Sequence, residues 1–416
     1  MKRDNRLRKH VLSAALVLAL LATAAAWGMG GYDSDSAPTE PKLVVKNGGD
    51  NVNDSLRDVI ASAANGATIT FAEDVTEITL TSAISFSQSD ITIDGKGVVT
   101  ITKSAAGNFR LLNSTASSGK LTLKGLTFEN GRTTENGGGV FAKSDVELED
   151  CTFKNNVGRD GGGLYAGGKA ELKDCIFNGN TAISNGGGLY ADGSADIKQC
   201  EFNHNAAAYG GGAFANGKAD LTGCIFDANS AQSGGGIYAN NDAGMTGGRF
   251  TNNTADYGGG MFVKDNAELT NCMFIDNKAD RSGGGLSAGA TALVGCTFDG
   301  NTAGENGGGA RVVNDAVLTD CMFTGNKSGS DGSGVYVGGD ADLTRCAFND
   351  NVSGGEDKGA YAVGTLEETE CSYERNKIKV KDQTGLLIGI AVASILVGLI
   401  AVLLVLQSKG KLAKKV

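Results

Sequence analysis

The chain has 416 residues, 64 of them glycine and 2 proline, and its formal net charge is −10. Because glycine weakens helix interiors, this composition argues against helical bundles and helical repeat proteins. Residues 27–385 hold 28 Lys and Arg against 46 Asp and Glu, a charge of −18, since nine basic residues and one acidic residue lie outside this range. A body this acidic should repel nucleic acid, so we expect no nucleic-acid partner.

The first residues are typical of an exported protein. Residues 1–26 have a basic start, an apolar stretch over 11–21 and small residues at 24–26, which together predict a secretory signal peptide. Residues 27–45 are polar and hold both prolines, so they are predicted to be a linker.

Residues 46–135 are predicted to form an N-terminal cap and irregular first coils. Ser55 and Asp58 form a capping-box pattern at the start of a short helix, and the apolar residues of 56–63 share one face of it. Such a face could seal the open end of a solenoid. Strand-like stretches follow at 67–71, 77–80, 90–94, 98–102 and 121–123.

Residues 136–376 repeat one motif: a glycine triplet, an apolar-aromatic-small run, an apolar strand and Cys-x-Phe-x-x-Asn. The cysteines stand 24 or 25 residues apart, except in one interval of 48 where Gly248 takes the missing position: Cys151, Cys175, Cys200, Cys224, Cys272, Cys296, Cys321, Cys346 and Cys371. An asparagine follows each of these ten positions by five residues: Asn156, Asn180, Asn205, Asn229, Asn253, Asn277, Asn301, Asn326, Asn351 and Asn376. A fixed period in this range indicates a solenoid, in which each repeat stacks on the next.

The short alternating runs within each repeat predict the fold class. They favour an all-β protein, a right-handed, single-stranded parallel β-helix of about 24–25 residues per coil, with three short strands in each coil. In the second regular coil, Leu164, Leu172 and Phe177 should point inward and stack on their counterparts in the next coil.

We interpret the cysteine and asparagine columns as structural ladders. Stacked side chains of neighbouring coils lie about 4.8 Å apart, further than the Cβ separation that a disulfide prefers, so we expect reduced, buried cysteines. Oxidation of a few pairs is the alternative in an exported protein. The asparagines are predicted at a turn, in a left-handed backbone conformation, with their amides bonded to those of the coils above and below.

The C-terminal residues predict a membrane anchor. After a juxtamembrane stretch over 377–385, residues 386–406 form an uninterrupted run of 21 apolar or small residues, long enough to span a bilayer as one transmembrane α-helix. The lysines of 407–416 follow directly, which predicts a cytoplasmic tail and an extracellular β-helix on a single-pass cell-membrane protein.

Two motifs resemble known families. The segment from Ser55 to Ile60, followed by Asn65-Gly-Ala-Thr-Ile-Thr-Phe71, is similar to the start of bacterial and archaeal surface β-helix proteins. Gly-Gly-Gly-Leu-Tyr at 161–165 and Phe-x-x-Asn at 177–180 resemble the GGA[ILV] and FxxN repeats of chlamydial polymorphic outer membrane proteins. The two resemblances cover most of residues 46–376, and they imply display on the cell surface and, for some relatives, adhesion.

Catalytic candidates are few. One outward strand column is acidic and could supply a carboxylate pair or a weak Ca²⁺ site, although a solvated strand face is the favoured interpretation: Glu147, Glu171, Asp196, Asp220, Glu268 and Asp342. His204 is the one histidine beyond the signal peptide, so Ser-His-Asp and Cys-His mechanisms lack a base. We therefore expect no catalytic residue, no metal ligand and no cofactor beyond weakly bound Ca²⁺.

The strongest binding candidate is a column of aromatic residues, the aromatic stripe, that should point outward along one face. It comprises Phe141, Tyr165, Tyr190, Phe214, Tyr238, Phe262, Tyr336 and Tyr361, with Ser287 and Arg311 interrupting it. The rings could hold sugar rings or an apolar partner surface, or they could simply stack to stabilise the sheet. A ligand is expected first where the pattern breaks, around Ser287, Arg311 and Arg249.

These observations predict a membrane-anchored surface protein that adheres to a glycan or protein partner and has no catalytic activity. An anchored polysaccharide lyase or hydrolase of the pectin-lyase-like fold is the first alternative, and a structural envelope spacer is the second.

Overall fold

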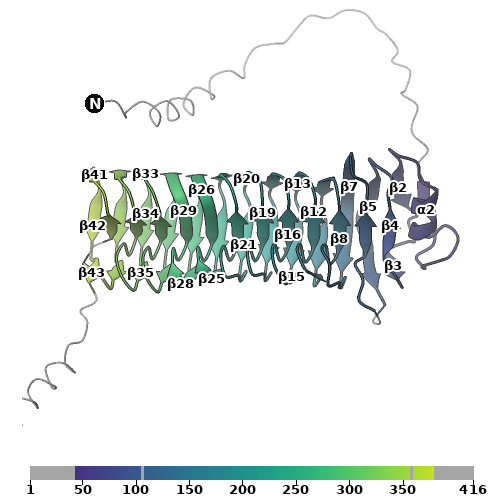
Figure 1. The fold of residues 1–416 in the computed structure, drawn as a ribbon, viewed down its shortest axis with the longest axis horizontal. Helices are drawn as coiled ribbons and strands as arrows, with labels where there is room; N and C mark the ends of the chain where they lie inside the picture. Colours follow the sequence, from purple (N-terminus) through teal and green to yellow (C-terminus); the bar gives the residue numbers. More distant parts are fainter. Residues whose placement is uncertain (1–42, 105–106, 357–358, 379–416) are drawn as a thin grey trace, which may run out of the picture. The chain divides into compact units, whose positions relative to one another are not determined.

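The computed structural model describes residues 43–104, 107–356 and 359–378. Over these residues the chain winds into an all-β parallel solenoid of about 13 turns (Figure 1). Each coil hydrogen-bonds to the next in register, so that Phe153 lies opposite Phe177 and Phe177 opposite Phe202. The predicted parallel β-solenoid is therefore confirmed, while its right-handed winding stays a prediction.

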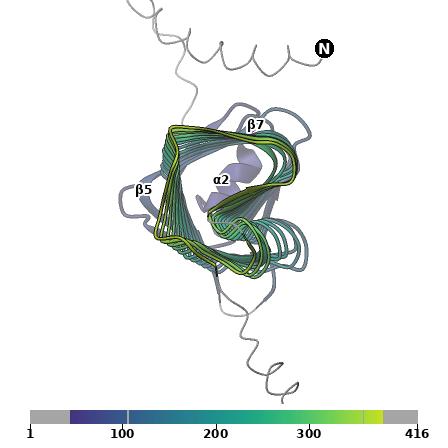
Figure 2. The same cartoon turned by 90° about the vertical axis from the view of Figure 1, so that its left-hand side faces the viewer.

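The N-terminal end is closed by a short helix. Strand β1 (Leu43–Val45) pairs with β2 (Thr68–Phe71), so the solenoid begins before the end of the linker predicted over 27–45. Helix α2 (Leu56–Ser62) follows, with Leu56 and Ile60 fully buried. Seen along the stack, α2 lies within the outline of the coils at their far end (Figure 2), where it covers the interior as predicted.

The cap of α2 differs in one detail from the predicted capping box. The backbone N–H of Asp58 donates to Ser55 Oγ at 3.3 Å, as expected. The Asp58 carboxylate, however, accepts from the backbone N–H of Asp54 at 2.9 Å rather than from that of Ser55. Ser55 N instead donates to the carbonyl of Val52, so the turn that precedes the helix satisfies it.

The first coils are irregular. Their remaining strands are β3 (Glu77–Leu80), β4 (Ile84–Phe86), β5 (Thr92–Lys103), β6 (Leu112–Ser114) and β7 (Lys120–Glu129). The long β5 covers the two separate stretches predicted at 90–94 and 98–102, with a register shift between Asp94 and Val99. Strands β4 and β6 had no counterpart in the sequence prediction.

The regular coils have four strand positions rather than the three predicted, although in two coils the fourth position is a single bridged residue, Ala206 or Ser230. The first carries the aromatic stripe: β8 (Val140–Ala142), β12 (Leu164–Ala166), β16 (Leu189–Ala191), β19 (Ala213–Ala215), β22 (Ile237–Ala239), β26 (Met261–Thr270), β29 (Leu286–Val294), β32 (Ala310–Val312), β36 (Val335–Val337) and β40 (Ala360–Ala362). The second carries the acidic column: β9 (Asp145–Glu149), β13 (Ala170–Lys173), β17 (Ala195–Lys198), β20 (Ala219–Thr222), β23 (Ala243–Thr246), β33 (Ala316–Thr319), β37 (Ala341–Thr344) and β41 (Leu366–Thr369). In two of the coils a single long strand, β26 in one and β29 in the other, occupies both the first and the second strand position.

The third strand follows the cysteine, and the fourth follows the asparagine. The third strands are β10 (Thr152–Lys154), β14 (Ile176–Asn178), β18 (Glu201–Asn203), β21 (Ile225–Asp227), β24 (Arg249–Thr251), β27 (Met273–Ile275), β30 (Thr297–Asp299), β34 (Met322–Thr324), β38 (Ala347–Asn349) and β42 (Ser372–Glu374). The fourth are β11 (Val157–Gly158), β15 (Thr181–Ala182), β25 (Thr254–Tyr257), β28 (Lys278–Ser282), β31 (Thr302–Ala303), β35 (Lys327–Ser328), β39 (Val352–Ser353) and β43 (Lys377–Ile378). Apart from β25 and β28, these fourth strands have two residues each, which is too short for an alternating sequence pattern to reveal them.

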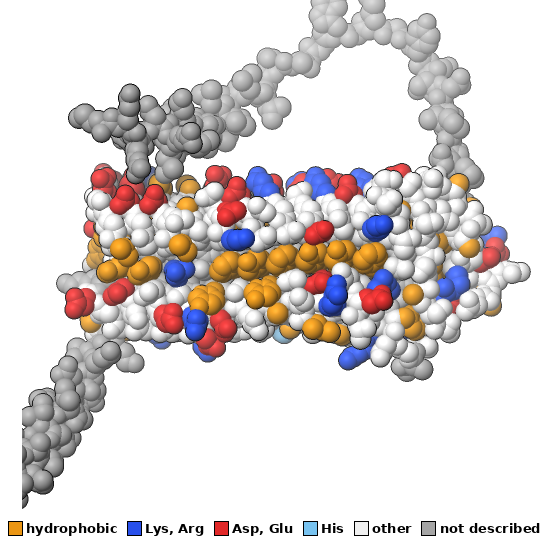
Figure 3. Space-filling model, viewed as in Figure 1, with side chains coloured by type: hydrophobic (Ala, Val, Ile, Leu, Met, Phe, Trp, Pro, Cys, Tyr) orange, Lys and Arg blue, Asp and Glu red, His pale blue; other side chains and the backbone are white. Residues whose placement is uncertain are grey.

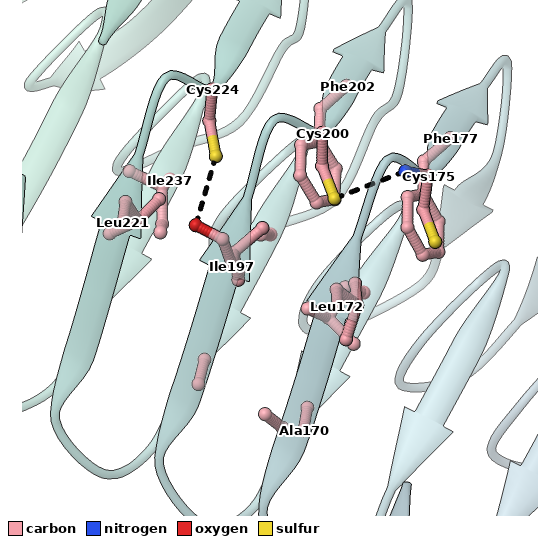
Figure 4. Close-up of a cluster of buried hydrophobic side chains, with 14 of the residues drawn as sticks. Ala170, Leu172, Cys175, Phe177, Ile197, Cys200, Phe202, Leu221, Cys224 and Ile237 are labelled. Carbon is pink, nitrogen blue, oxygen red and sulfur yellow. Dashed lines mark hydrogen bonds between the residues drawn. The ribbon is translucent and has the colours of Figure 1, made fainter. Parts of the chain in front are cut away.

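The interior is filled by columns of stacked side chains, in which cysteine follows cysteine and phenylalanine follows phenylalanine from coil to coil (Figure 4). The phenylalanines from Phe128 to Phe348 stack with ring centroids 4.7–5.1 Å apart and are fully buried. The cysteines are free thiols, and all but Cys371 are buried, as predicted for a reduced ladder. Gly248 stands at the cysteine position of its coil. A Cβ added to Gly248 would lie 1.8 Å from Met245 Cε, so the methionine side chain occupies the space of the missing thiol.

The asparagine ladder is buried and bonded as predicted. Asn180 Nδ2 donates to Asn205 Oδ1 at 3.0 Å and to the carbonyl of Phe153 at 2.8 Å, and Asn180 N donates to Asn205 Oδ1 at 2.9 Å. The same set of bonds recurs from Asn156 to Asn351, and Asn376 completes it in the last coil.

The left-handed backbone expected at the ladder asparagines lies one residue earlier. Positive φ occurs at the residue before each ladder asparagine, such as Asn155 (54°), His204 (55°) and Ala228 (52°), and not at the asparagine itself. A second positive φ precedes each cysteine position, as at Asp174 (53°). The asparagine side chain therefore stabilises the corner through hydrogen bonds rather than by adopting the unusual backbone conformation.

The predicted membrane anchor lies outside the described residues. Within 43–104, 107–356 and 359–378, no helix is long and apolar enough to cross a membrane. The signal peptide over 1–26, the transmembrane helix over 386–406 and the tail over 407–416 stay predictions.

Candidate binding surface

The aromatic stripe forms a continuous ladder over six coils. Its rings lie in register on β8, β12, β16, β19, β22 and β26, with centroids 4.8–5.2 Å apart and planes within 12° of parallel. The strand alternation explains this position, because the residues before and after each ring, such as Leu164 and Ala166 around Tyr165, point inward and are fully buried. Figure 3 shows the hydrophobic band that crosses this face of the stack.

Each ring of the stripe is partly exposed. Burial raises the pKa of Tyr165, and the nearby carboxylates of Asp192 and Asp160 raise it further. The pKa of Tyr190 is also raised, first by burial and then by Asp192, whose Oδ1 accepts a hydrogen bond from Tyr190 Oη at 3.1 Å. The hydroxyls of Tyr165 and Tyr190 therefore stay protonated at neutral pH and can donate hydrogen bonds at the edge of the stripe.

The stripe ends where the sequence pattern breaks. Ser287 follows Phe262 in register and is buried, with 1% of its surface exposed, and the half-buried Arg311 comes next. Tyr336 and Tyr361 then stack at 5.3 Å as a separate pair. The strands keep their pairing through the break, so a ring at this position is not needed to form a coil.

A ligand was expected first around Ser287, Arg311 and Arg249. Ser287 is buried, so its side chain is closed to a ligand, while binding at the half-buried Arg311 stays a prediction. A shallow depression of about 520 Å³ does include the third residue of that expectation, Arg249, and it lies over the third strands: Asn178, Asn203, His204, Ile225, Asp227, Arg249, Thr251 and Asn252.

A row of polar side chains, the polar row, borders the stripe. The sequence interpretation did not identify this row. Asp192, Asn216, Asn240 and Lys264 each stand two residues after a ring, at intervals of 24. Asn216 Nδ2 donates to Asp192 Oδ1 at 3.2 Å, and Asn240 Nδ2 donates to Asn216 Oδ1 at 2.9 Å. Lys264 Nζ donates to Asn240 Oδ1 at 3.4 Å, which completes a chain of side chains across four coils. The constant interval of 24 was the signal that could have revealed this polar row.

The first ring of the stripe is covered by a cation. The guanidinium of Arg110 lies over the ring of Phe141, 5.0 Å from its centroid, and forms an ion pair with Glu135. Further along, Tyr209 packs edge-on against Tyr238 at 5.7 Å. With Phe141 covered by Arg110 and Tyr238 in contact with Tyr209, the longest run of rings without such a contact is Tyr165, Tyr190 and Phe214.

The acidic column lies in register on the second strands, as predicted, from Glu147 through Glu171 and Asp196 to Asp220. Lysines pair with its members: Lys169 Nζ lies 2.5 Å from Glu171 Oε1, and Lys198 Nζ lies 3.0 Å from Asp196 Oδ2. Lys173, two residues after Glu171 on the same strand, pairs with Glu149 at 3.0 Å. These pairs are typical of a solvated strand face.

The described residues contain no group of three or more His, Cys, Asp or Glu side chains placed to hold a metal ion. Weak Ca²⁺ binding by the acidic column therefore stays a prediction without a preformed site to support it.

Comparison with known proteins identifies the repeat. The family described as the Chlamydia polymorphic membrane protein (Chlamydia_PMP) repeat matches residues 174–192, which hold Cys175, Asn180 and Tyr190. No curated protein matches the chain. A solved structure titled "Geobacillus virus E2 - ORF18" matches with 14% identity and a TM-score of 0.33, over 80% of this chain and 62% of that one. This chain thus spans less than two thirds of the viral protein's length. The chain is thus a parallel β-solenoid in which residues 174–192 match a repeat of the polymorphic membrane protein type.

Proposed function

We propose that this chain is a cell-surface adhesin, in which an extracellular β-helix attaches to a glycan or protein partner through the aromatic stripe. A C-terminal single-pass helix over 386–406 would hold it in the membrane, with the basic residues 407–416 in the cytoplasm. The polymorphic membrane protein repeat at 174–192 supports a location on the surface.

One observation carries the proposal. Ser287 and Arg311 occupy the ring position without any loss of strand pairing, so the solenoid does not require aromatic side chains there. Six consecutive half-exposed rings are then more than the fold needs. Aromatic side chains in partly exposed positions are the residues that contribute most strongly to binding interfaces.

The test compares two triple variants of the full-length chain in detergent. Tyr165→Ala/Tyr190→Ala/Tyr238→Ala removes three stripe rings, while Ile176→Ala/Met273→Ala/Met322→Ala removes exposed apolar side chains from the third strands. Retention on immobilised polysaccharides and extracellular matrix proteins should fall at least about tenfold for the first variant and stay near wild type for the second. Equal retention of the two variants would refute the stripe as the attachment face.

The same assay addresses the two alternatives. Release of soluble sugar from a retained polysaccharide would indicate a lyase or hydrolase, and the acidic column and the depression at Arg249 would become the sites to mutate. No retention on any surface would favour the structural spacer.

A further inference from the structure

The polar row places hydrogen-bonding groups beside the apolar rings of the stripe. The side-chain amides of Asn216 and Asn240 each have two N–H groups. One N–H of each amide donates to the next member of the row, and no described residue accepts a hydrogen bond from the other N–H. Asn216 and Asn240 are half-buried, and Asp192 and Lys264 are exposed at the two ends of the row. Their hydrogen bonds to one another hold the amides in fixed orientations, so a ligand would meet preorganised donors and acceptors.

The rings beside this row present edges as well as faces. Nearly parallel rings whose centroids lie 4.8–5.2 Å apart are offset rather than in full face-to-face contact, so part of each ring stays open to a ligand. Four coils therefore combine an apolar ring with a hydrogen-bonding side chain two residues away. This combination suits a sugar, which has an apolar C–H face and a rim of hydroxyl groups.

The spacing of the coils selects one kind of sugar chain. Rings recur along the stripe at the separation of adjacent β-strands. An extended β-1,4-linked glycan is a flat ribbon whose sugar rings repeat at nearly this spacing, so that one sugar can meet one coil. An α-1,4-linked glycan curves into a helix and loses this register after a few units.

The charge of the molecule favours neutral glycans over acidic ones. Residues 27–385 carry 28 basic and 46 acidic side chains, and the tyrosines of the stripe lie near Asp160 and Asp192. A polyanionic glycan would be repelled by this field, whereas a neutral one would not.

We propose that the rings of Tyr190, Phe214, Tyr238 and Phe262, together with the polar row from Asp192 to Lys264, form a binding site for an extended, neutral β-1,4-linked glycan. The site takes one sugar unit per coil and spans four coils. This inference rests on the proposed function, because it names the ligand class of the stripe.

Calorimetric titration of the full-length chain, in a detergent without a sugar headgroup, tests the site with oligosaccharides of two to six units. Neutral β-1,4-linked oligomers of glucose and of N-acetylglucosamine are the probes, and α-1,4-linked oligomers of glucose are the matched control ligands. We expect the affinity for at least one β-linked series to rise from the disaccharide to the tetrasaccharide and then to level off. Binding of the α-linked series should be at least about tenfold weaker.

Two variants locate the site. Asn216→Ala/Asn240→Ala should lower the affinity for the β-linked tetrasaccharide about tenfold, since two hydrogen bonds to the ligand are lost. Asn203→Ala, a half-buried asparagine on a third strand, should leave it unchanged. Circular dichroism of all variants checks that the solenoid is intact.

The outcomes separate the two proposals. If no β-linked oligomer binds, if the α-linked series binds equally well, or if the double variant binds like wild type, the glycan site is refuted. If the stripe variant still loses retention on another surface, the adhesin proposal stands with a different partner. If retention does not depend on the stripe at all, both proposals fail.

Discussion

The solenoid carries two aromatic ladders with nearly the same stacking geometry and different roles. The inner phenylalanines stack at 4.7–5.1 Å without a break from Phe128 to Phe348. The outer stripe stacks at 4.8–5.3 Å, but Ser287 and Arg311 interrupt it. Stacking geometry follows from the in-register repeat and appears wherever rings recur. Burial and continuity, rather than ring spacing, therefore distinguish the ladder that holds the fold from the one that is available for binding.

The largest expected difference lies between Phe226→Ala and Phe214→Ala. Phe226 is fully buried, so its truncation should lower the free energy of unfolding by about 3–5 kcal/mol through lost burial and the cavity left behind. Phe214 is half-exposed, and its loss should cost about 1 kcal/mol, mainly from ring stacking. Urea denaturation of the two variants measures both values. Equal costs would show that the stripe is a structural ladder.

Asn229→Ala tests the polar part of the interior. The change removes the donor to the carbonyl of Phe202 (2.7 Å) and to Asn253 Oδ1 (3.0 Å), and the acceptor of Asn205 N. Each buried partner left unsatisfied costs about 1–3 kcal/mol, so we expect a loss of at least about 3 kcal/mol in urea denaturation. Asn203→Ala, an outward asparagine of the neighbouring coil, serves as the control and should change stability by less than about 0.5 kcal/mol.

The thiol ladder predicts a loss of stability at alkaline pH. Burial raises the pKa of Cys224 from 9.0 to about 11, so the folded state keeps the proton that the unfolded chain releases above pH 9. The stabilisation is complete below pH 9 and is lost as the pH rises from 9 to 11, by about 2 kcal/mol for this residue. Denaturation midpoints at pH 7, 9 and 11 measure the loss. The variant Cys224→Ala should show a smaller dependence on pH, and an unchanged dependence would contradict the assignment.

The smallest effect is expected from restoring a ring at the break. Arg311 lies opposite Tyr336 in the stripe column, so Arg311→Tyr would extend the separate pair to three stacked rings. Ring stacking should raise the free energy of unfolding by about 0.5–1.5 kcal/mol, as measured by urea denaturation. A clear destabilisation would show that this coil has no room for a ring, which would mean that the break is required by the fold.

Much of the interior was predictable from the repeat. The buried cysteine and phenylalanine columns and the bonded asparagines follow from residue type and a constant interval, because in-register coils bring position n of each repeat together. The cap formed by α2 follows instead from its capping pattern and its apolar face. The polar row from Asp192 to Lys264 has the same regular interval and was overlooked because its residue types vary. The fourth strands, such as β15 (Thr181–Ala182), could not be predicted, since two residues cannot display an alternating pattern.

The sequence by itself determined the solenoid, its period and the inward or outward direction of each column, because these depend only on a repeated pattern and on strand alternation. Tertiary structure alone decided the properties that depend on contact between coils. The positive φ at His204 rather than at Asn205 and the burial of Ser287 appear only in the stacked coils, while Met245 fills the space at Gly248 from within its own coil. A single repeat contains no information about these contacts, since each coil is completed by the side chains of the coils on either side of it.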